Sequence, residues 1–259
     1  MKKIVILMLM LVLGGVALKA DEQTELRPLD DWSFFQLGLF FNVPSSMEYS
    51  NIYGIKTGWP ISDGKGRVYG LEASWLYAGT HHLYGLQGSW VSCYTEDLKG
   101  IQSAFVFCRT NGPAMGLQAT FGVSLIDGPT KGIQGSLAYC QTMDEYMGLQ
   151  AAFLTLTKDL YGFQASGVGI ADEVNGVQVS LAGFSKGATG ALLNGVISKN
   201  DGPLTGVQTA IVNMSKEVTG VQFGIINIAE KNGFQFGLIN YIKGGVIPFF
   251  PFCNISIQD

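Results

Sequence analysis

Few residues of this chain are suited to catalysis or metal binding. The only histidines among its 259 residues are His81 and His82, which are adjacent in an expected turn. Successive side chains of an extended chain point in opposite directions, so this pair cannot readily bind one metal ion, and no cysteine or histidine lies beside it at a spacing typical of zinc. A serine nucleophile would need one of these histidines as its base. We therefore expect no enzymatic activity, no catalytic residue, no metal site and no cofactor.

A short motif recurs through nearly the whole chain and must position any functional residue. Twelve glycines are each followed by one further residue, nearly always apolar, and then, in ten copies, by a glutamine; the exceptions are Glu72 and Leu192. Successive glycines are 13 to 16 residues apart, which fits one strand and one turn per unit. Residues 54–56 and 34–36 look like degenerate earlier copies. The complete copies are Gly85 with Gln87, Gly100 with Gln102, Gly116 with Gln118, Gly132 with Gln134, Gly148 with Gln150, Gly162 with Gln164, Gly176 with Gln178, Gly206 with Gln208, Gly220 with Gln222, and Gly233 with Gln235.

The residues after each glycine alternate as in a β-strand. In the unit that begins at Gly85, Leu86 and Trp90 share one face with Gly88, while Gln87 and Ser89 share the other. A period of two residues indicates strands. Helical spacing is not sustained after residue 20, and 35 glycines would be costly in helices. The sequence therefore predicts an all-β repeat protein.

Two architectures fit this pattern, and we favour an outer-membrane-type β-barrel of about 14 to 16 short strands in a closed antiparallel meander. Lipid would then contact the bulky face and the lumen would be lined by Gln, Ser, Ala and Gly. The alternative is a parallel β-solenoid, which explains why the turns do not alternate in length and why glutamines could stack as ladders. Against it, turn segments such as residues 96–99 offer a second inner wall few apolar groups. The bulky face carries Trp75, Trp90, Phe105, Phe121 and Phe153.

The expected roles of Glu72 and the cysteines depend on whether the fold is a barrel or a solenoid. A carboxylate in place of the repeat glutamine at Glu72 could line a pore or, with a partner, act as an acid; alternatively it is a tolerated substitution near a rim. Cys93, Cys108 and Cys140 each lie eight residues after their glycine. In a parallel stack Cys93 and Cys108 would be about 5 Å apart, within reach of a disulfide; in a meander they would be roughly 25 to 30 Å apart. Burial as small apolar side chains is the alternative.

The N-terminus and the overall composition indicate export. Residues 1–20 combine Lys2 and Lys3, an uncharged apolar run and a small residue at Ala20, which is typical of a signal peptide. Residues 21–259 are then expected to form a single β-repeat domain. A net charge of −4 argues against nucleic acid as a partner. Charged residues form only 14% of the chain, against about 25% in soluble proteins, so we expect contact with outer-membrane lipid; no protein or glycan partner can be named.

The last two units, residues 220–227 and 233–240, follow the pattern Gly-apolar-Gln-x-Gly-apolar-apolar-Asn. With the closing segment at residues 248–256, they make the sequence similar to the leptospiral-type surface-repeat family of exported bacterial proteins. The resemblance implies a surface-associated protein, although the end of the chain at Asp259 departs from the aromatic terminus common in that family. The expected function is a structural or passive pore-like element of the cell envelope or outer membrane. The alternative is a surface-displayed solenoid for adhesion or scaffolding.

Overall fold

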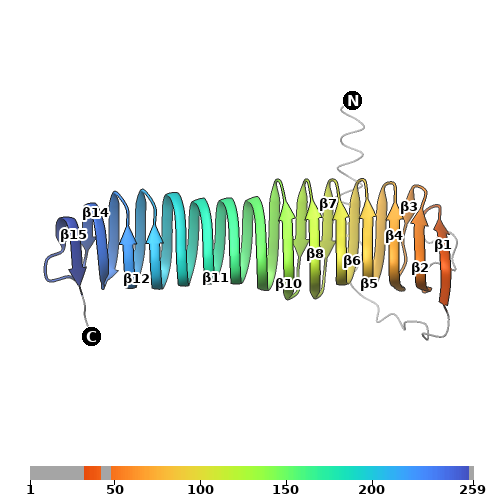
Figure 1. Cartoon of the computed structure of the whole chain (residues 1–259), viewed down its shortest axis with the longest axis horizontal. Coiled ribbons are helices and arrows are strands. Elements are labelled where there is room, and N and C mark those ends of the chain that lie inside the picture. Colours follow the sequence, from red (N-terminus) through yellow and green to blue (C-terminus); the bar gives the residue numbers. More distant parts are fainter. Residues whose placement is uncertain (1–31, 42–47, 257–259) are drawn as a thin grey trace, which may run out of the picture.

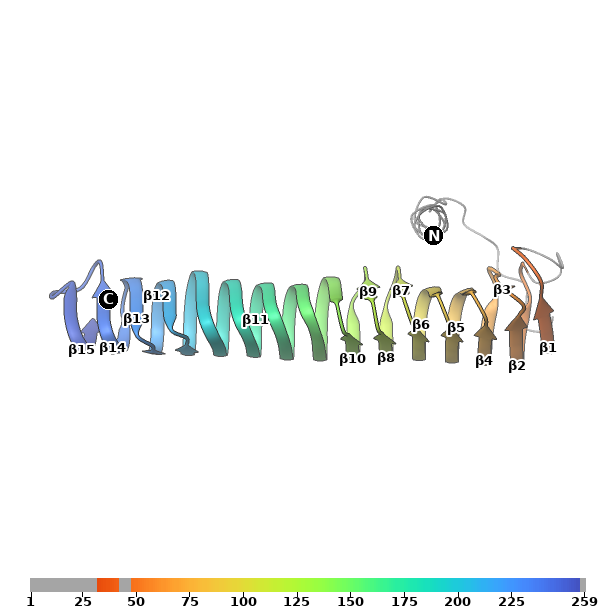
Figure 2. The same ribbon diagram turned by 90° about the horizontal axis from the view of Figure 1, so that it is seen from above.

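The computed structural model describes residues 32–41 and 48–256, which form an elongated parallel β-solenoid (Figures 1 and 2). The expected signal peptide, residues 1–20, lies outside the described residues. The strands are β1 Trp32–Gly38, β2 Asn51–Gly58, β3 Ile61–Ser62, β4 Arg67–Ser74, β5 Tyr77–Ser89, β6 Ser92–Ala104, β7 Phe107–Thr110, β8 Ala114–Thr120, β9 Val123–Ile126, β10 Thr130–Ser136, β11 Tyr139–Thr209, β12 Val212–Phe223, β13 Ile226–Lys231, β14 Gly233–Ile242 and β15 Phe249–Ser256.

Each coil of the solenoid has two walls. The first wall is made by the strands that carry the Gly-apolar-Gln motif, such as β8 and β10, and the second wall by short strands such as β7 and β9. Where the chain stays extended around the corners, several coils merge into one long strand, as in β11. Every pairing is parallel except that of β15, which pairs antiparallel with β14 and covers the C-terminal end.

The coils are stacked in register, motif over motif. Gly100 pairs with Gly85 and with Gly116, and the glutamine two residues after each glycine pairs with its equivalent. The degenerate early copies are confirmed, because Gln36 pairs with Lys56 and Lys56 pairs with Glu72.

The repeat glycines are required by close backbone contact between coils. Gly100 has a φ of 145°, a region that only glycine populates readily. A Cβ atom at this position would lie 2.0 Å from the carbonyl oxygen of Gly85. The same conflict recurs along the stack, so glycine at this position permits the coils to approach each other.

Apolar residues two positions before most of the repeat glycines form a buried row inside the stack. Leu83, Leu98 and Leu204 belong to it, and Tyr146 is its largest member. Thr130 interrupts the row, so the interior has one apolar cluster on each side of this residue.

The barrel prediction is wrong, and the solenoid alternative is correct. The scarcity of apolar residues outside the main strand favoured the barrel over the solenoid, but the second wall lines the interior with Thr, Ser, Cys and Asn instead. These side chains satisfy the glutamines: Thr110 donates to Gln102 Oε1 at 3.1 Å and Ser215 donates to Gln208 Oε1 at 2.8 Å. The interior of the described coils is filled by these buried side chains, so a passive pore has no lumen there.

In the part of the chain that the structure describes, no helix is both long and apolar enough to cross a membrane.

Candidate functional site

The repeat glutamines form a buried ladder of amide hydrogen bonds. Seven of the ten donate from Nε2 to Oε1 of the glutamine in the preceding coil, as in Gln102 to Gln87 at 2.7 Å and Gln164 to Gln150 at 2.8 Å. The same donor direction continues in Gln222 to Gln208 at 2.7 Å. Because all of these dipoles point the same way, neighbouring bonds reinforce one another in the low-dielectric interior.

The ladder is divided into three runs, which end at Gln118, Gln178 and Gln235. The gap after Gln118 arises because Gln134 donates to Ser124 Oγ at 3.0 Å instead of to the preceding glutamine. The gap after Gln178 arises because Leu192 occupies the next position, and Gln178 Oε1 has no hydrogen-bond partner in the structure. All of these glutamines lie inside the coils, so their role is to hold successive coils together.

An asparagine ladder on the second wall supports the C-terminal coils. Asn213 donates to Asn227 Oδ1 at 2.8 Å, and Asn227 donates to Asn240 Oδ1 at 2.8 Å. Its donors point toward the C-terminal coils, opposite to the glutamine ladder. The units at residues 206–213, 220–227 and 233–240 therefore take part in both ladders.

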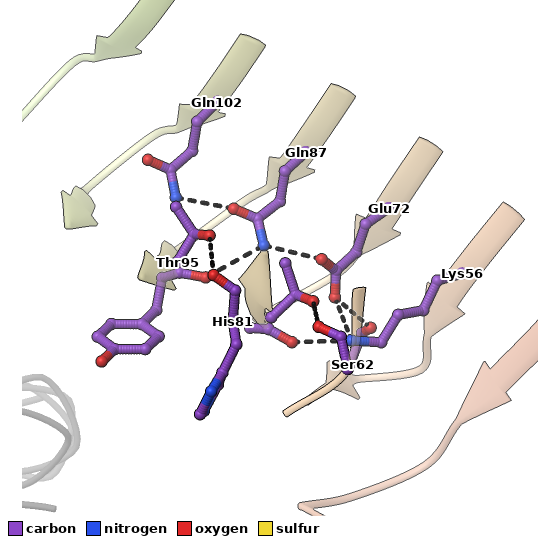
Figure 3. Close-up of polar contacts among 11 residues, drawn as sticks. Lys56, Ser62, Glu72, His81, Gln87, Thr95 and Gln102 are labelled. Atoms are coloured by element: carbon purple, nitrogen blue, oxygen red, sulfur yellow. Dashed lines mark hydrogen bonds and ion pairs between the residues drawn. The ribbon is translucent and has the colours of Figure 1, made fainter. Parts of the chain in front are cut away.

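The first glutamine run begins at a buried ion pair (Figure 3). Lys56 Nζ lies 2.8 Å from Glu72 Oε1, and their side chains are 2% and 0% exposed. Gln87 Nε2 donates to Glu72 Oε2 at 2.8 Å, and Ser62 Oγ donates to Glu72 Oε1 at 2.7 Å. Lys56 also donates to the carbonyl oxygen of Gly79 at 2.8 Å. Both carboxylate oxygens of Glu72 therefore have hydrogen-bond partners.

This arrangement corrects both expectations for Glu72. The residue neither lines a pore nor sits near a rim as an incidental substitution; it accepts the first amide of the ladder, and Lys56 neutralises it. A buried carboxylate that has no contact with solvent is not accessible to a substrate. Its chemistry is structural, because a buried charge is tolerated only when it is paired and hydrogen-bonded.

Asp63 and the histidines flank the ion pair without forming a metal site. Burial raises the pKa of Asp63, although Lys56 opposes this effect, and burial lowers the pKa of His81. His82 Nδ1 lies 2.7 Å from Asp97 Oδ2, whereas His81 Nδ1 lies 4.0 Å from Glu96 Oε2, so the two rings engage different partners. Among the residues that the structure describes, no group of three or more His, Cys, Asp or Glu side chains could hold a metal ion.

Cys93 and Cys108 are neighbours on the second wall. Their Cα atoms are register partners, and both are buried as free thiols. Cys140 is separated from Cys108 by Ser124, which occupies the intervening coil. Burial raises the pKa of Cys108 well above its usual value and that of Cys140 to about 11, so few thiolates are present at neutral pH. The geometry places Cys93 and Cys108 where a disulfide was expected, and the disulfide itself stays a prediction.

The outer surface of the first wall is the largest apolar feature of the molecule. We define the apolar wall as the outward side chains one residue before and one, three and five residues after each motif glycine, from Tyr53 to Leu238. The row five residues after the glycine is the most exposed, with Trp90 and Phe153 each 66% exposed. Monomeric proteins rarely expose apolar patches larger than a few hundred Å². The exposed members of that row are Trp59, Trp75, Trp90, Phe105, Phe121, Leu137, Phe153, Leu181, Ile211, Ile225 and Leu238.

The aromatic rings on this wall stack on one another along the solenoid. Tyr69 lies between Tyr53 and Tyr84 with centroid distances of 4.6 Å on both sides. Phe105 and Phe121 stack at 4.9 Å, with an angle of 4° between their planes. Rings that use their faces on each other offer mainly their edges to a partner. Such a surface suits packing against other apolar side chains better than it suits flat stacking on sugar rings.

Charged residues are concentrated away from the apolar wall. Lys99 and Lys131 are its only charged members in the described residues, and Lys99 Nζ lies 5.3 Å from the ring centroid of Tyr84. The opposite side of the coils carries ion pairs such as Lys186 with Asp172 at 2.7 Å and Arg109 with Asp127 at 2.7 Å. These ion pairs therefore lie outside the apolar wall.

The bulky face that the sequence predicts is present on the first wall. The aromatic residues expected to face lipid in a barrel do point outward, and the glutamines expected to line a lumen are packed inside the coils. The signal for a continuous wall was present in the sequence, because a large apolar residue recurs five positions after most of the glycines.

Comparisons of this chain with protein-family models, curated proteins and solved structures found no match.

Proposed function

We propose that this protein is an exported, surface-displayed β-solenoid that serves as a non-catalytic scaffold or adhesion element of a bacterial cell envelope. The observation that carries the proposal is the apolar wall, which extends along a solenoid whose interior is held by buried ladders. A filled, hydrogen-bonded interior offers little room for a substrate, whereas a long outer surface suits binding to another large surface.

Export is supported by residues 1–20, whose pattern is that of a signal peptide. The similarity of the last two units to leptospiral-type surface repeats agrees with display at the cell surface. The charged side of the solenoid would face water, and the apolar wall would be covered by its partner. Outer-membrane lipid, a second copy and another envelope protein are the surfaces that could cover it.

Surface proteolysis of intact cells tests the proposal. We expect an externally added protease to degrade the natural chain while cytoplasmic and periplasmic marker proteins stay intact. An uncleaved chain that remains in the cytoplasm would contradict the proposal.

A substitution pair tests whether the apolar wall is the contact surface. Trp90→Ser combined with Phe105→Ser changes exposed side chains, so we expect an unchanged melting temperature and a loss of attachment to the cell envelope. Asp172→Ser combined with Lys186→Ser, on the charged side, is the matched control and should leave attachment unchanged. If both variants attach like the natural chain, the apolar wall is not the contact surface.

A further inference from the structure

The apolar wall is large enough to bind a second copy of this chain. It extends over thirteen stacked coils, from the coil of Gly54 to that of Gly233. With about 4.8 Å between strands and about 3.3 Å per residue along them, the wall measures roughly 60 Å by 20 Å. Two copies in face-to-face contact would bury about 2,300 Å² in total, which is within the range of obligate homodimers.

Residue sizes on the wall vary between its two halves. In the row three residues after each glycine, the N-terminal half has small side chains, such as Ala73 and Ser103, and the C-terminal half has large ones, such as Leu193 and Phe223. In the row five residues after the glycine, the order is reversed, with Phe105 in the N-terminal half and Gly195 in the C-terminal half. The two halves of the wall therefore differ in the positions of their largest and smallest side chains.

An end-to-end reversal aligns these sizes coil by coil. The central coil of the thirteen begins at Gly148, so the coil of Gly70 would face that of Gly220, and the coil of Gly100 would face that of Gly190. Small then meets large in several aligned pairs, whereas the bulky residues Trp90 and Phe121 meet Ile211 and Leu181. Isologous two-fold contacts place residue i against j and j against i. The aligned pairs include Ala73 with Phe223, Ser103 with Leu193, Ala119 with Val179, Ile101 with Ala191 and Phe105 with Gly195.

Several polar side chains of the wall would also face suitable partners in the reversed second copy. In the row one residue before the glycine, Tyr69 would face Thr219 and Tyr84 would face Thr205, which places each phenol near a hydroxyl group. Lys131 would face the ring of Tyr161, a favourable cation–π arrangement. A shallow depression lined by Leu137, Ala151 and Phe153 lies at the central coils, close to the two-fold axis.

A lipid surface or a sugar ligand fits the apolar wall less well than a second copy of the chain does. Attraction to an anionic membrane surface needs clusters of Lys and Arg, whereas the wall has only two lysines in the described residues and the chain carries a net charge of −4. Sugar recognition needs free ring faces, and the tyrosine and phenylalanine rings here cover each other.

We infer that the apolar wall is covered by a second copy of this chain, reversed end to end about a two-fold axis that passes through the coil of Gly148. The inference rests on the proposed function, because it names the partner of the same wall. It predicts a flat dimer in which both charged sides face water.

Cysteine crosslinking tests the reversed alignment. In a Cys253→Ser background, which removes the exposed thiol, Ala151→Cys lies beside the two-fold axis and should form a covalent dimer on mild oxidation. Ala73→Cys and Phe223→Cys should each give little dimer alone and a covalent heterodimer when the two variants are mixed. Lys186→Cys, on the opposite side, is the control and should give no specific dimer.

Two results would overturn the inference. The first is that the protein sediments as a monomer at micromolar concentration without detergent, while its circular dichroism shows that the β-structure is folded. The other is efficient linking of Ala73→Cys to itself, which indicates an unreversed pair. A folded monomer that is displayed on the cell surface would refute the dimer and leave the proposed function standing. A reversed dimer that stays in the cytoplasm would refute the proposed function and leave the dimer standing.

Discussion

Lys56 and Glu72 place two charges in a buried ladder that otherwise consists mainly of amide side chains. They occupy the ladder position in two successive coils, so the ion pair replaces one amide-to-amide step of the ladder. A buried pair of this kind contributes little net stability against neutral partners, but the loss of one member leaves the other charged and unsolvated.

Lys56→Met should therefore destabilise the protein strongly, by about 3 to 5 kcal/mol, because it leaves Glu72 without a counter-charge. The double variant Lys56→Met with Glu72→Gln should recover most of that loss, because a glutamine at position 72 can accept the amide of Gln87. Urea unfolding monitored by circular dichroism measures both free energies. Equal destabilisation of the single and double variants would show that the charge is not the cause.

Asp63 gives the stability a component that depends on pH. Burial raises its folded-state pKa above the unfolded value of about 3.9, so the folded protein binds protons more tightly than the unfolded chain. The contribution to stability is present at low pH and is lost as the pH rises through the folded-state pKa. Asp63→Asn should raise the unfolding midpoint at pH 7 and weaken its dependence on pH between 4 and 7. A midpoint at pH 7 that falls on substitution would contradict this assignment.

At the level of single elements, each strand that carries the Gly-apolar-Gln motif has two key positions, the glycine and the residue two positions later, and their roles differ. The glycine permits backbone contact between coils, and the residue two positions later supplies the ladder. Gly135 lies in the same strand as Gly132, but a Cβ atom at Gly135 would meet nothing within 4 Å, whereas one at Gly132 would lie 2.0 Å from the oxygen of Gly116. A glycine at the motif position, such as Gly132 or Gly116, and Gly135 therefore form a matched test.

Gly116→Ala should cost roughly 3 kcal/mol or more, because the alanine combines an unfavourable φ with a backbone clash. Its Cβ would lie 2.0 Å from the oxygen of Gly100, and φ is 133°. Gly135→Ala should change the free energy of unfolding little. Thermal unfolding of both variants checks the difference, and similar melting temperatures would argue against close stacking of the coils.

Leu192 interrupts the glutamine ladder next to an amide oxygen that has no hydrogen-bond donor. A glutamine there can donate to Gln178 Oε1, which has no partner in the structure. Leu192→Gln should therefore cost under about 1 kcal/mol even though it places an amide in the core, whereas Leu83→Gln, in the apolar row, should cost about 2 to 5 kcal/mol. Equal losses for the two substitutions, measured by urea unfolding, would contradict a functioning ladder.

At the level of the whole molecule, the sequence predicts the all-β class, the repeat and the early copies around Gln36 and Lys56, but not the direction of the strands. The alternation around Gly85 is the same in a barrel and in a solenoid, since both have one face of glutamines and one of large apolar residues. The second wall was missed because Thr110 and Ser124 look like turn residues until their hydrogen-bond partners are known. The equivalent positions of Cys93, Cys108 and Cys140 were the best available sign of stacking.

Exposure of the wall could not be predicted for the same reason. Trp90 and Phe105 suit lipid, a protein partner or a core equally well in the sequence, and only the closed coil shows that they lie outside it. The ion pair of Lys56 with Glu72 was also hidden, because the two residues are neighbours only when successive coils are parallel and in register.

Crosslinking of two adjacent coils tests parallel stacking most directly. A Cβ atom at Gly88 would lie 3.9 Å from Ser103 Oγ on the outer wall, so Gly88→Cys with Ser103→Cys should form an intramolecular disulfide at low protein concentration. Gly88→Cys with Gly135→Cys, in the same row but three coils apart at about 14 Å, is the control and should not link. Peptide mapping that joins residues 88 and 103 is the predicted result. Two reactive thiols that fail to link in the folded protein would contradict the solenoid.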